Sequence, residues 1–356
     1  MAVNQPLQSR PQALGLRPGE LVRVRTILEI GPTLDAQGSL DGMPFMPEML
    51  QYCGRTFRVS RRADKTCAGD GVVRRMHNAV HLGDLRCDGA SHGGCQAACL
   101  LFWKEAWLER VEDEAAMPPS PSPNGAESTI TETLVAATTE SDTANEPRYR
   151  CHATEIPNAS TPLRFRELDQ YVRDAHNWGV TKIVRGLVVE LFNLWQSFAR
   201  RHLPRTLLIA DARPYPFIRG PLPVRKGATP SGRLDLQPGE LVRIKSKAEI
   251  EATLDEANNN RGLCFDGEMS RHCGRTARVR GRVERIVDEH TGELIEMKSE
   301  CIMLEGVVCE GDYHRFCARG IYAYWREIWL ERIDESNGNG NRRRLPACMG
   351  ERPPSG

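Results

Sequence analysis

The chain has 356 residues, of which 27% are charged, and its formal net charge is only +1. This length allows two or three domains with separate cores, and the balanced charge excludes a globally basic nucleic-acid-binding protein. No run approaches the roughly 18 consecutive apolar residues of a membrane span, and the N-terminal stretch has no signal-peptide core. We therefore expect a cytoplasmic protein whose 12 cysteines stay reduced, which favours metal or thiol chemistry over disulfides.

The dominant feature of the sequence is an internal repeat. Residues 16–35 read LRPGELVRVRTILEIGPTLD and residues 236–255 read LQPGELVRIKSKAEIEATLD, a shift of 220 (236 minus 16). CGRT recurs with the same shift, and WKEAWLERV later overlies WREIWLERI after two extra residues. Copies of about 95 residues suit small domains better than solenoid units. We predict two modules, at 14–112 and 234–334.

Each copy reads as a series of short strands joined by turns. PGELVRVR, or PGELVRIK, is a turn that leads into an alternating strand. In the second copy TARVRGRVERIV gives another strand, and DEHTGE links it to LIEMK as a hairpin. Short sequential strands with Gly-marked turns predict a mainly β fold with a helical insert, built from two homologous small antiparallel barrels. The opening strand resembles the first strand of SH3-like barrels.

Four segments lie outside the predicted modules. Residues 113–148 contain no Lys or Arg before Glu146 and many Pro, Ser and Thr residues, so we expect a flexible acidic linker. The others are a helical segment at 149–205, a Pro-rich linker at 206–233 and a flexible tail at 335–356.

The helix expected at 181–201 has a clear apolar half. Leu187, Leu191, Trp195 and Phe198 fall on one side at about 100° per residue, while Lys and Arg residues gather on the other. We expect this face to pack on a core or between domains. The alternative is a membrane surface, because Trp, Phe and flanking basic residues also suit an interfacial helix.

A repeated loop carries the strongest chemical signal. Residues 87–95 read CDGASHGGC and residues 309–317 read CEGDYHRFC, so both copies contain Cys-x4-His-x2-Cys. A loop rich in Gly, Asp and Ser can fold three ligands around one ion, and the cysteine of each CGRT turn can supply a fourth. Three thiolates and one imidazole are typical of closed structural zinc sites. We predict two zinc ions per chain, held by Cys53, Cys87, His92 and Cys95 and by Cys273, Cys309, His314 and Cys317.

Two alternatives to this ligand set remain open. Cys67 or Cys301 could replace Cys53 or Cys273, because each belongs to strands that lead into the loops. The cysteines could also be small buried core residues, since free Cys is among the most buried residue types.

Two other features could serve as binding surfaces. Trp103 with Trp107, and Trp325 with Trp329, could line a groove for a peptide partner or could belong to the cores. The alternating Arg278, Arg280 and Arg282 could contact phosphates or form a solvated face. Aromatic residues are only 6% of the chain, so stacking platforms for nucleic acid are not evident.

The tandem as a whole, with CGRT, Cys-x4-His-x2-Cys and WREIWLER or WKEAWLER, resembles a bacterial family of uncharacterised tandem-repeat proteins, and the resemblance implies no particular reaction. We expect a non-catalytic, zinc-stabilised binding or scaffold protein with a protein or peptide partner. A second hypothesis is a metal- or thiol-dependent enzyme or accessory subunit in which the first copy is reactive, through extra residues such as Cys67, His77, His81 and Cys99. A third is peripheral nucleic-acid binding.

Overall fold

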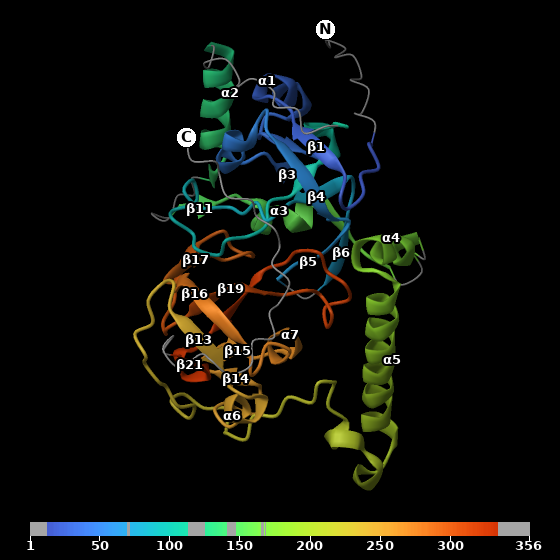
Figure 1. Cartoon of the computed structure of the whole chain (residues 1–356), viewed down its shortest axis with the longest axis vertical. Coiled ribbons are helices and arrows are strands. Elements are labelled where there is room, and N and C mark those ends of the chain that lie inside the picture. Colours follow the sequence, from blue (N-terminus) through green and yellow to red (C-terminus); the bar gives the residue numbers. More distant parts are fainter. Residues whose placement is uncertain are drawn as a thin grey trace.

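The computed structural model describes residues 13–69, 72–112, 125–140, 147–164, 167 and 169–333. Its first half contains a five-stranded antiparallel sheet with the strand order β8-β7-β4-β1-β9 (Figure 1). The strands are β1 (Leu21–Val24), β4 (Thr56–Arg62), β7 (Ala79–Leu82), β8 (Trp103–Lys104) and β9 (Leu108–Arg110).

The second half contains an equivalent sheet with the order β20-β19-β16-β13-β21. Its strands are β13 (Leu241–Ile244), β16 (Thr276–Arg282), β19 (Ile302–Val308), β20 (Tyr322–Trp325) and β21 (Leu330–Arg332). The registers match as well, because Leu21 pairs with Arg58 and Leu241 with Arg278. β4 and β16 are also irregular at the same point, after Val59 and after Val279. The prediction of a mainly antiparallel β protein with a helical insert is confirmed. We call the two halves the first and second modules.

The repeated apolar pattern builds one core in each module. Alternation along the opening strand places Val22 and Val24 inside, and the equivalent Val242 and Ile244 are also fully buried. The four tryptophans of the repeated WKEAW and WREIW segments are fully buried too. The hypothesis of an open tryptophan groove is therefore wrong, because these rings pack edge-on against Phe45 and Phe265 inside the cores.

The remaining elements are short strands and helices around these sheets. The strands are β2 (Ser39–Leu40), β3 (Met43–Pro44), β5 (Lys65–Cys67), β6 (Val73–Met76), β10 (Thr139–Glu140), β11 (Arg148–Tyr149), β12 (Ser160–Pro162), β14 (Asn259–Asn260), β15 (Leu263–Cys264), β17 (Arg285–Val287) and β18 (Leu294–Glu296). The helices are α1 (Ile27–Ile30), α2 (Gly125–Ala136), α3 (His152–Ala159), α4 (Asp169–Trp178), α5 (Val180–His202), α6 (Lys247–Glu251) and α7 (Gly267–Ser270). Short 3-10 turns include η2 (Pro47–Tyr52).

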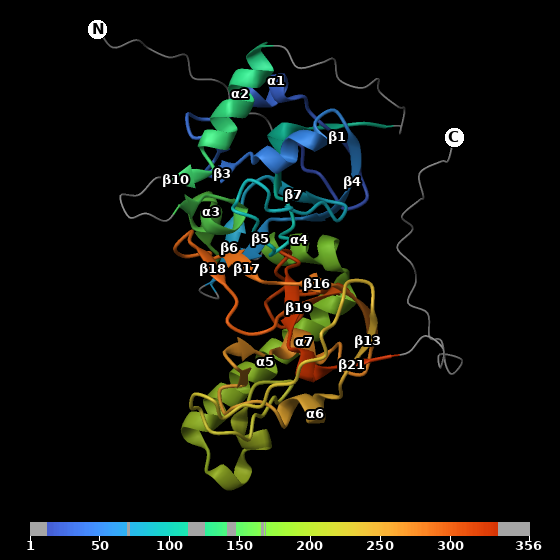
Figure 2. The same ribbon diagram turned by 90° about the vertical axis from the view of Figure 1, so that its left-hand side faces the viewer.

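The two modules meet about halfway along the molecule, at the level of the equivalent hairpins β5–β6 and β17–β18 (Figures 1 and 2). Gln96 N donates to the Arg285 carbonyl at 3.0 Å, and Ala318 N donates to the Lys65 carbonyl at the same distance. The two bonds join equivalent positions of the repeat, because Gln96 corresponds to Ala318 and Lys65 corresponds to Arg285. Each module therefore binds the hairpin of the other with its own Cys/His loop, as in a two-fold symmetric pair.

Part of the expected acidic linker is helical. Residues 125–136 form α2, and Leu134 is buried in the first core, while residues 113–124 and 141–146 lie outside the described part. Ile130 and Leu134 stand four residues apart and therefore share one face, which Gly31 and Gly38 approach closely. Two apolar residues are too few for a convincing periodic signal in the sequence. The predicted tail at 335–356 lies outside the described residues.

The apolar face of α5 is not packed as expected. Leu191 is 66% exposed, and Val184, Val188, Leu194 and Phe198 are all more than half exposed. Figure 1 shows α5 running down one side of the molecule, and only Ile183, Gln196 and Ala199 of this helix are buried. The core-packing expectation is wrong for most of this face, because periodicity identifies an apolar face but not what covers it. Within the described residues no helix is long and apolar enough to cross a membrane.

Candidate metal centres

The first centre joins η2 to the Cys/His loop that follows β7. Glu48 Oε1 lies 2.8 Å from His92 Nδ1 and 3.9 Å from Cys87 Sγ, and the sulfur lies 4.0 Å from the same ring nitrogen. Glu48 and His92 are almost fully buried. The three ligand atoms lie within 4.8 Å of one another, which is close enough to hold one metal ion.

The surroundings of His92 leave its Nδ1 available as a ligand. Nε2 lies 3.2 Å from the Arg150 carbonyl, and Nδ1 lies 2.8 Å from Glu48 Oε1, to which it donates when no ion is bound. With a metal ion bound, an N–H donated from Nε2 to the Arg150 carbonyl would leave the Nδ1 lone pair to the ion. Glu48 Oε2 is buried without a hydrogen-bond partner among the described residues. A cation between these atoms would satisfy both the lone pair and the unpaired oxygen. The donor set therefore fits a metal ion.

The second centre repeats this arrangement with α7 in place of η2. Cys309 Sγ lies 3.3 Å from His314 Nδ1, and Glu268 completes a cluster within 4.8 Å. His314 Nε2 faces Asp266 Oδ2 at 3.5 Å, so a carboxylate takes the place of the Arg150 carbonyl. Cys309 and Glu268 are buried, and His314 is partly exposed.

Both loops adopt the same tight fold because a glycine stands at the same point in each. Gly89 has φ +72°, and a Cβ there would lie 1.9 Å from the Cys95 carbonyl oxygen. Gly311 has φ +75°, and its Cβ would lie 2.5 Å from the Cys317 oxygen. Any other residue would be both strained and in collision with the chain. The glycine thus lets the backbone just after the first cysteine of each loop approach the backbone of the last cysteine.

Two ligand candidates were missed from the sequence, Glu48 and Glu268. Each accepts a hydrogen bond from a backbone N–H of its loop, from Ser91 at 3.0 Å and from Tyr313 at 2.6 Å. Burial favours a raised pKa for Glu48, but the hydrogen bond and charge of His92 outweigh it and the pKa is lowered. Burial raises the pKa of Glu268. A signal was present, since these acids match under the repeat shift and each lies beside a buried methionine.

The cysteines of the two CGRT turns lie elsewhere. The metal-competent clusters of the described residues contain neither Cys53 nor Cys273, and they also leave out the last loop cysteines, Cys95 and Cys317, and the hairpin cysteine Cys67. Burial raises the pKa of Cys53 to about 12, with a smaller contribution from Glu127, and raises that of Cys273 to about 11. Lys247 and Glu251 of α6, not the loop residues, are the charges that act on Cys273. Ligation by Cys53 and Cys273 stays a prediction.

The last cysteine of each loop contacts the opposite module. Cys317 Sγ lies 3.2 Å from Cys67 Sγ and accepts a hydrogen bond from Cys67 N at 3.2 Å. Cys95 Sγ accepts the equivalent bond from Val287 N at 3.3 Å. The hydrogen bond from the Cys317 thiol lowers the pKa of Cys67 to about 6, and the charges of Arg319 and His314 act in the same direction. The same bond raises the pKa of Cys317.

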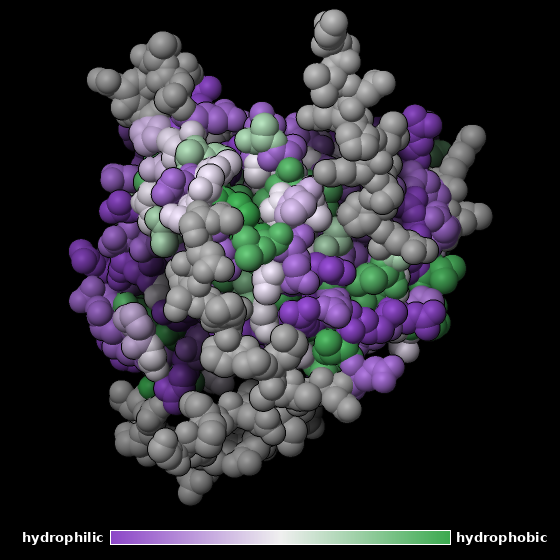
Figure 3. All heavy atoms as spheres, turned by 90° about the horizontal axis from the view of Figure 1, so that it is seen from above, coloured by the Kyte–Doolittle hydropathy of each residue, from purple (hydrophilic) through white to green (hydrophobic). Residues whose placement is uncertain are grey.

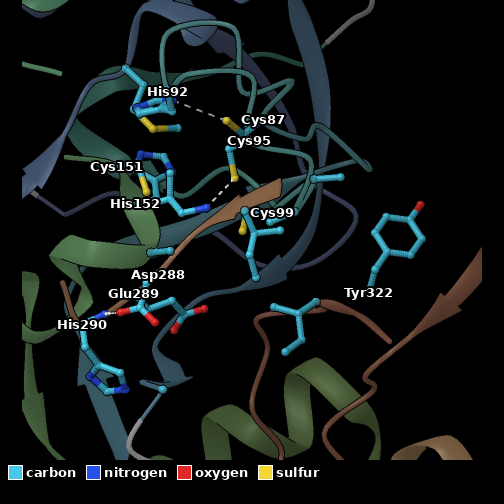
Figure 4. A pocket seen from close by; sticks show the side chains of 18 of the residues that line it. Cys87, His92, Cys95, Cys99, Cys151, His152, Asp288, Glu289, His290 and Tyr322 are labelled. Atoms are coloured by element: carbon cyan, nitrogen blue, oxygen red, sulfur yellow. Dashed lines mark hydrogen bonds between the residues drawn. The ribbon is translucent and has the colours of Figure 1, made fainter. Parts of the chain in front are cut away.

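A cavity of about 290 Å³ opens between the modules at the first centre. Figure 4 shows Cys87, Cys95, Cys99 and His92 of the first module, together with Cys151, on one side and Asp288, Glu289 and His290 of the second module on the other. Burial raises the pKa of Cys99 to about 12 and lowers that of His152 to about 4, so both groups are neutral near pH 7. The cysteines on the cavity wall are Cys87, Cys95, Cys99 and Cys151.

The other residues singled out in the sequence have structural partners. His81 is fully buried, its Nδ1 lies 2.8 Å from the Leu101 carbonyl, and burial lowers its pKa to about 3. Arg326 donates to the buried Cys301 sulfur at 3.3 Å inside the second module. His77 lines a separate surface pocket with Asp41 and Lys104.

The chemical interpretation of the two centres rests on their geometry, because comparison of the chain with protein-family models, curated proteins and solved structures found no match.

Proposed function

We propose that the chain is a non-catalytic, zinc-stabilised protein of two SH3-like modules that acts as a binding or scaffold component. One observation carries the proposal: a buried Glu/Cys/His cluster recurs at equivalent positions in both modules. Imidazole, thiolate and carboxylate are all zinc ligands, and zinc accepts a tetrahedral shell of such mixed donors. A site that only catalysed a reaction would not need to be present twice in the same structural position.

The proposal predicts the metal content and the metal dependence of the fold. The purified full chain should contain two equivalents of zinc, and a strong chelator should lower its melting temperature because metal binding free energy contributes to folding. Elemental analysis and thermal melts with and without chelator measure both quantities. A chain that is free of metal and melts at the same temperature with chelator would refute the proposal.

The thiols give divided support to the enzyme hypothesis. A reactive cysteine has a lowered pKa and an accessible, electropositive setting. Burial raises the pKa of Cys99 and of Cys151, which argues against reactive thiols there. The hydrogen bond from Cys317 lowers the pKa of Cys67 to about 6, and this thiol and the cavity at the first centre are the features that favour a reactive protein. Iron or copper bound in the first module alone would support that hypothesis, and zinc in both modules supports the scaffold.

Nucleic-acid binding finds little support in the arginines of β16. Arg278 donates to the Gly239 carbonyl at 2.8 Å, and Arg280 contacts the Tyr322 hydroxyl at 3.1 Å. Arg282 pairs with Glu327 at 2.6 Å. These guanidinium groups already take part in intramolecular bonds, so they are poorly suited to a phosphate-binding row.

A second candidate function, attachment to an anionic lipid surface, is favoured by the exposed stripe on α5. Three basic residues of the helix, Arg185, Arg200 and Arg201, are exposed as well, and Arg185 and Arg200 lie on the side away from the apolar stripe. Glu190 is the only acidic residue of the helix, and it pairs with Arg315 at 3.1 Å. An apolar stripe with basic flanks matches an interfacial helix. By contrast, hydrophobic residues on the face of the molecule shown in Figure 3 stand in small groups among hydrophilic ones. The stripe consists of Val180, Val184, Val188, Leu191, Leu194, Trp195 and Phe198.

The lipid proposal predicts that Leu191→Asp abolishes membrane association without unfolding the protein. The wild type should float with anionic vesicles and remain in solution with neutral ones, because basic residues contribute on the order of 1 kcal/mol each near an anionic surface. Since Leu191 is exposed, the melting temperature should stay unchanged. Val135→Asp is the matched control, because Val135 is also exposed on a helix, α2, away from the stripe. A wild type that does not float with anionic vesicles would exclude this function.

A further inference from the structure

The hairpin β5–β6 of the first module places a cysteine at the metal loop of the second. Cys67 Sγ lies 3.2 Å from Cys317 Sγ although the two residues are 250 positions apart. The hairpin is held there by the backbone bond from Ala318 N to the Lys65 carbonyl at 3.0 Å. Arg319 also donates to the Cys67 carbonyl at 3.2 Å and is anchored by Glu289 at 2.8 Å. Cys67 is therefore a fixed part of the second loop's surroundings.

We propose that Cys67 is the fourth ligand of the ion held by Cys309, His314 and Cys317, so that one metal ion binds residues of both modules. The inference deepens the proposed function and rests on it. It differs from the sequence-based ligand set, in which each module binds its ion with its own residues only. Cys67 then takes the place in the second centre that had been expected for Cys273.

The geometry of two sulfur-containing pairs supports this assignment. Zn–S bonds of about 2.3 Å imply a distance of about 3.8 Å between two thiolates of a tetrahedral shell. Cys67 and Cys317 lie 3.2 Å apart at their sulfurs, and Cys309 Sγ lies 3.3 Å from His314 Nδ1. Each pair is slightly shorter than one edge of such a tetrahedron. A metal ion held by all four residues would open the sulfur–sulfur edge by about 0.6 Å and the sulfur–nitrogen edge by about 0.3 Å. It would also have to draw the sulfurs of Cys67 and Cys317 toward Cys309 and His314, because the metal-competent cluster of the described residues at this centre contains neither of those sulfurs.

Glu268 has a second role available in this arrangement. Its carboxylate already accepts hydrogen bonds from Tyr313 N at 2.6 Å and Glu310 N at 3.1 Å, so it supports the backbone of the loop. A carboxylate that orients a ligand loop from outside tunes a metal site without completing its shell. The second centre can therefore be closed by three thiolates and one imidazole.

The first centre differs because Val287 occupies the position equivalent to Cys67. Val287 N makes the same bond to a loop sulfur, that of Cys95, but its side chain offers no ligand atom. The cavity of about 290 Å³ lies on this side, against Cys87, His92 and Cys95. A centre without the cysteine of the opposite module has to use Glu48 or leave a position open.

The test compares Cys67→Ser with Cys273→Ser in the full chain. In the cobalt-substituted wild type, thiolate-to-metal charge-transfer absorption reports the number of sulfur ligands. Cys67→Ser should lose the share of this absorption that one thiolate contributes. The affinity of the second centre for metal, measured by competition with a chelator, should fall by at least about 10–100-fold, the loss typical of removing a partner outside the ligand shell. Cys273→Ser should match the wild type in both measurements. The reverse result, with loss of metal and absorption in Cys273→Ser and none in Cys67→Ser, would overturn the assignment.

Alkylation of the wild type gives a second measurement that does not depend on a variant folding. Bound metal should protect Cys67 from iodoacetamide, while Cys273 should react at the same rate with and without metal. Equal reactivity of Cys67 in the metal-loaded and metal-free protein would overturn the inference even if two metals are bound. A wild type that binds no metal would instead refute the proposed function itself, so the two failures are distinguishable.

Discussion

His92→Ala should release the metal of the first centre and destabilise the first module by several kcal/mol. The imidazole contacts buried Glu48 and lies near half-buried Cys87. Its loss therefore removes a ligand and also leaves Glu48 with an unpaired buried charge. The metal content measured by elemental analysis should fall from two equivalents per chain to one. Thermal melts should show an early transition for the first module.

Cys99→Ser is the matched control for this experiment. Cys99 lines the same cavity but belongs to neither metal-competent cluster of the described residues. Its replacement should leave the metal content at two equivalents, and the small change of a buried thiol to a hydroxyl should cost on the order of 1 kcal/mol. Equal loss of metal in both variants would show that the ligands were assigned wrongly.

Asp174→Ala should strongly destabilise the protein although it lies outside the metal centres. Lys65 Nζ lies 2.6 Å from Asp174 Oδ2, and the two side chains are 6% and 0% exposed. Removal of the carboxylate leaves a buried ammonium without its partner, which costs about 3–5 kcal/mol. Because Lys65 Nζ also lies 5.3 Å from the centre of the Phe316 ring, the damage should reach the second metal loop.

Two control variants bracket the loss of unfolding free energy expected for Asp174→Ala, which is measured by chemical denaturation. Asp169→Ala removes an exposed ion pair from the same helix, in which Asp169 is 56% exposed, and should cost less than about 1 kcal/mol. The double replacement Lys65→Met with Asp174→Leu removes both charges and should be far less destabilising than Asp174→Ala alone. A small effect of Asp174→Ala would mean that water reaches Lys65.

The sequence predicted the sheets well because the repeat displays the same alternation twice. Val22 and Val24 in one copy, and Val242 and Ile244 in the other, point inward as their spacing requires. The pairing of Cys87 with His92 also followed from their place in one short loop. Local spacing is sufficient for both features, since each depends on residues that are near one another in the chain.

The rest depended on contacts between distant segments. Glu48 was overlooked because the ligand search considered cysteine and histidine alone, although the acid matched under the repeat shift. Nothing local shows that the hairpin carrying Cys67 crosses to the other module, since the sulfur it meets is 250 residues away. The apolar stripe of α5 was recognised, but periodicity cannot tell a packed face from an exposed one.

Each hairpin contacts the Cys/His loop of the opposite module, and this contact determines whether a substitution in one half affects one metal centre or both. In a pair of identical subunits with this geometry, the position of Cys67 and that of Val287 would be the same residue, and any substitution would alter both centres at once. A single covalent chain removes that constraint. One centre can acquire a ligand from its neighbour while the other acquires a hydrophobic side chain and a cavity. The tandem arrangement thus allows two candidate metal centres in nearly the same framework to differ in how firmly each would hold an ion and in how open each is to another molecule.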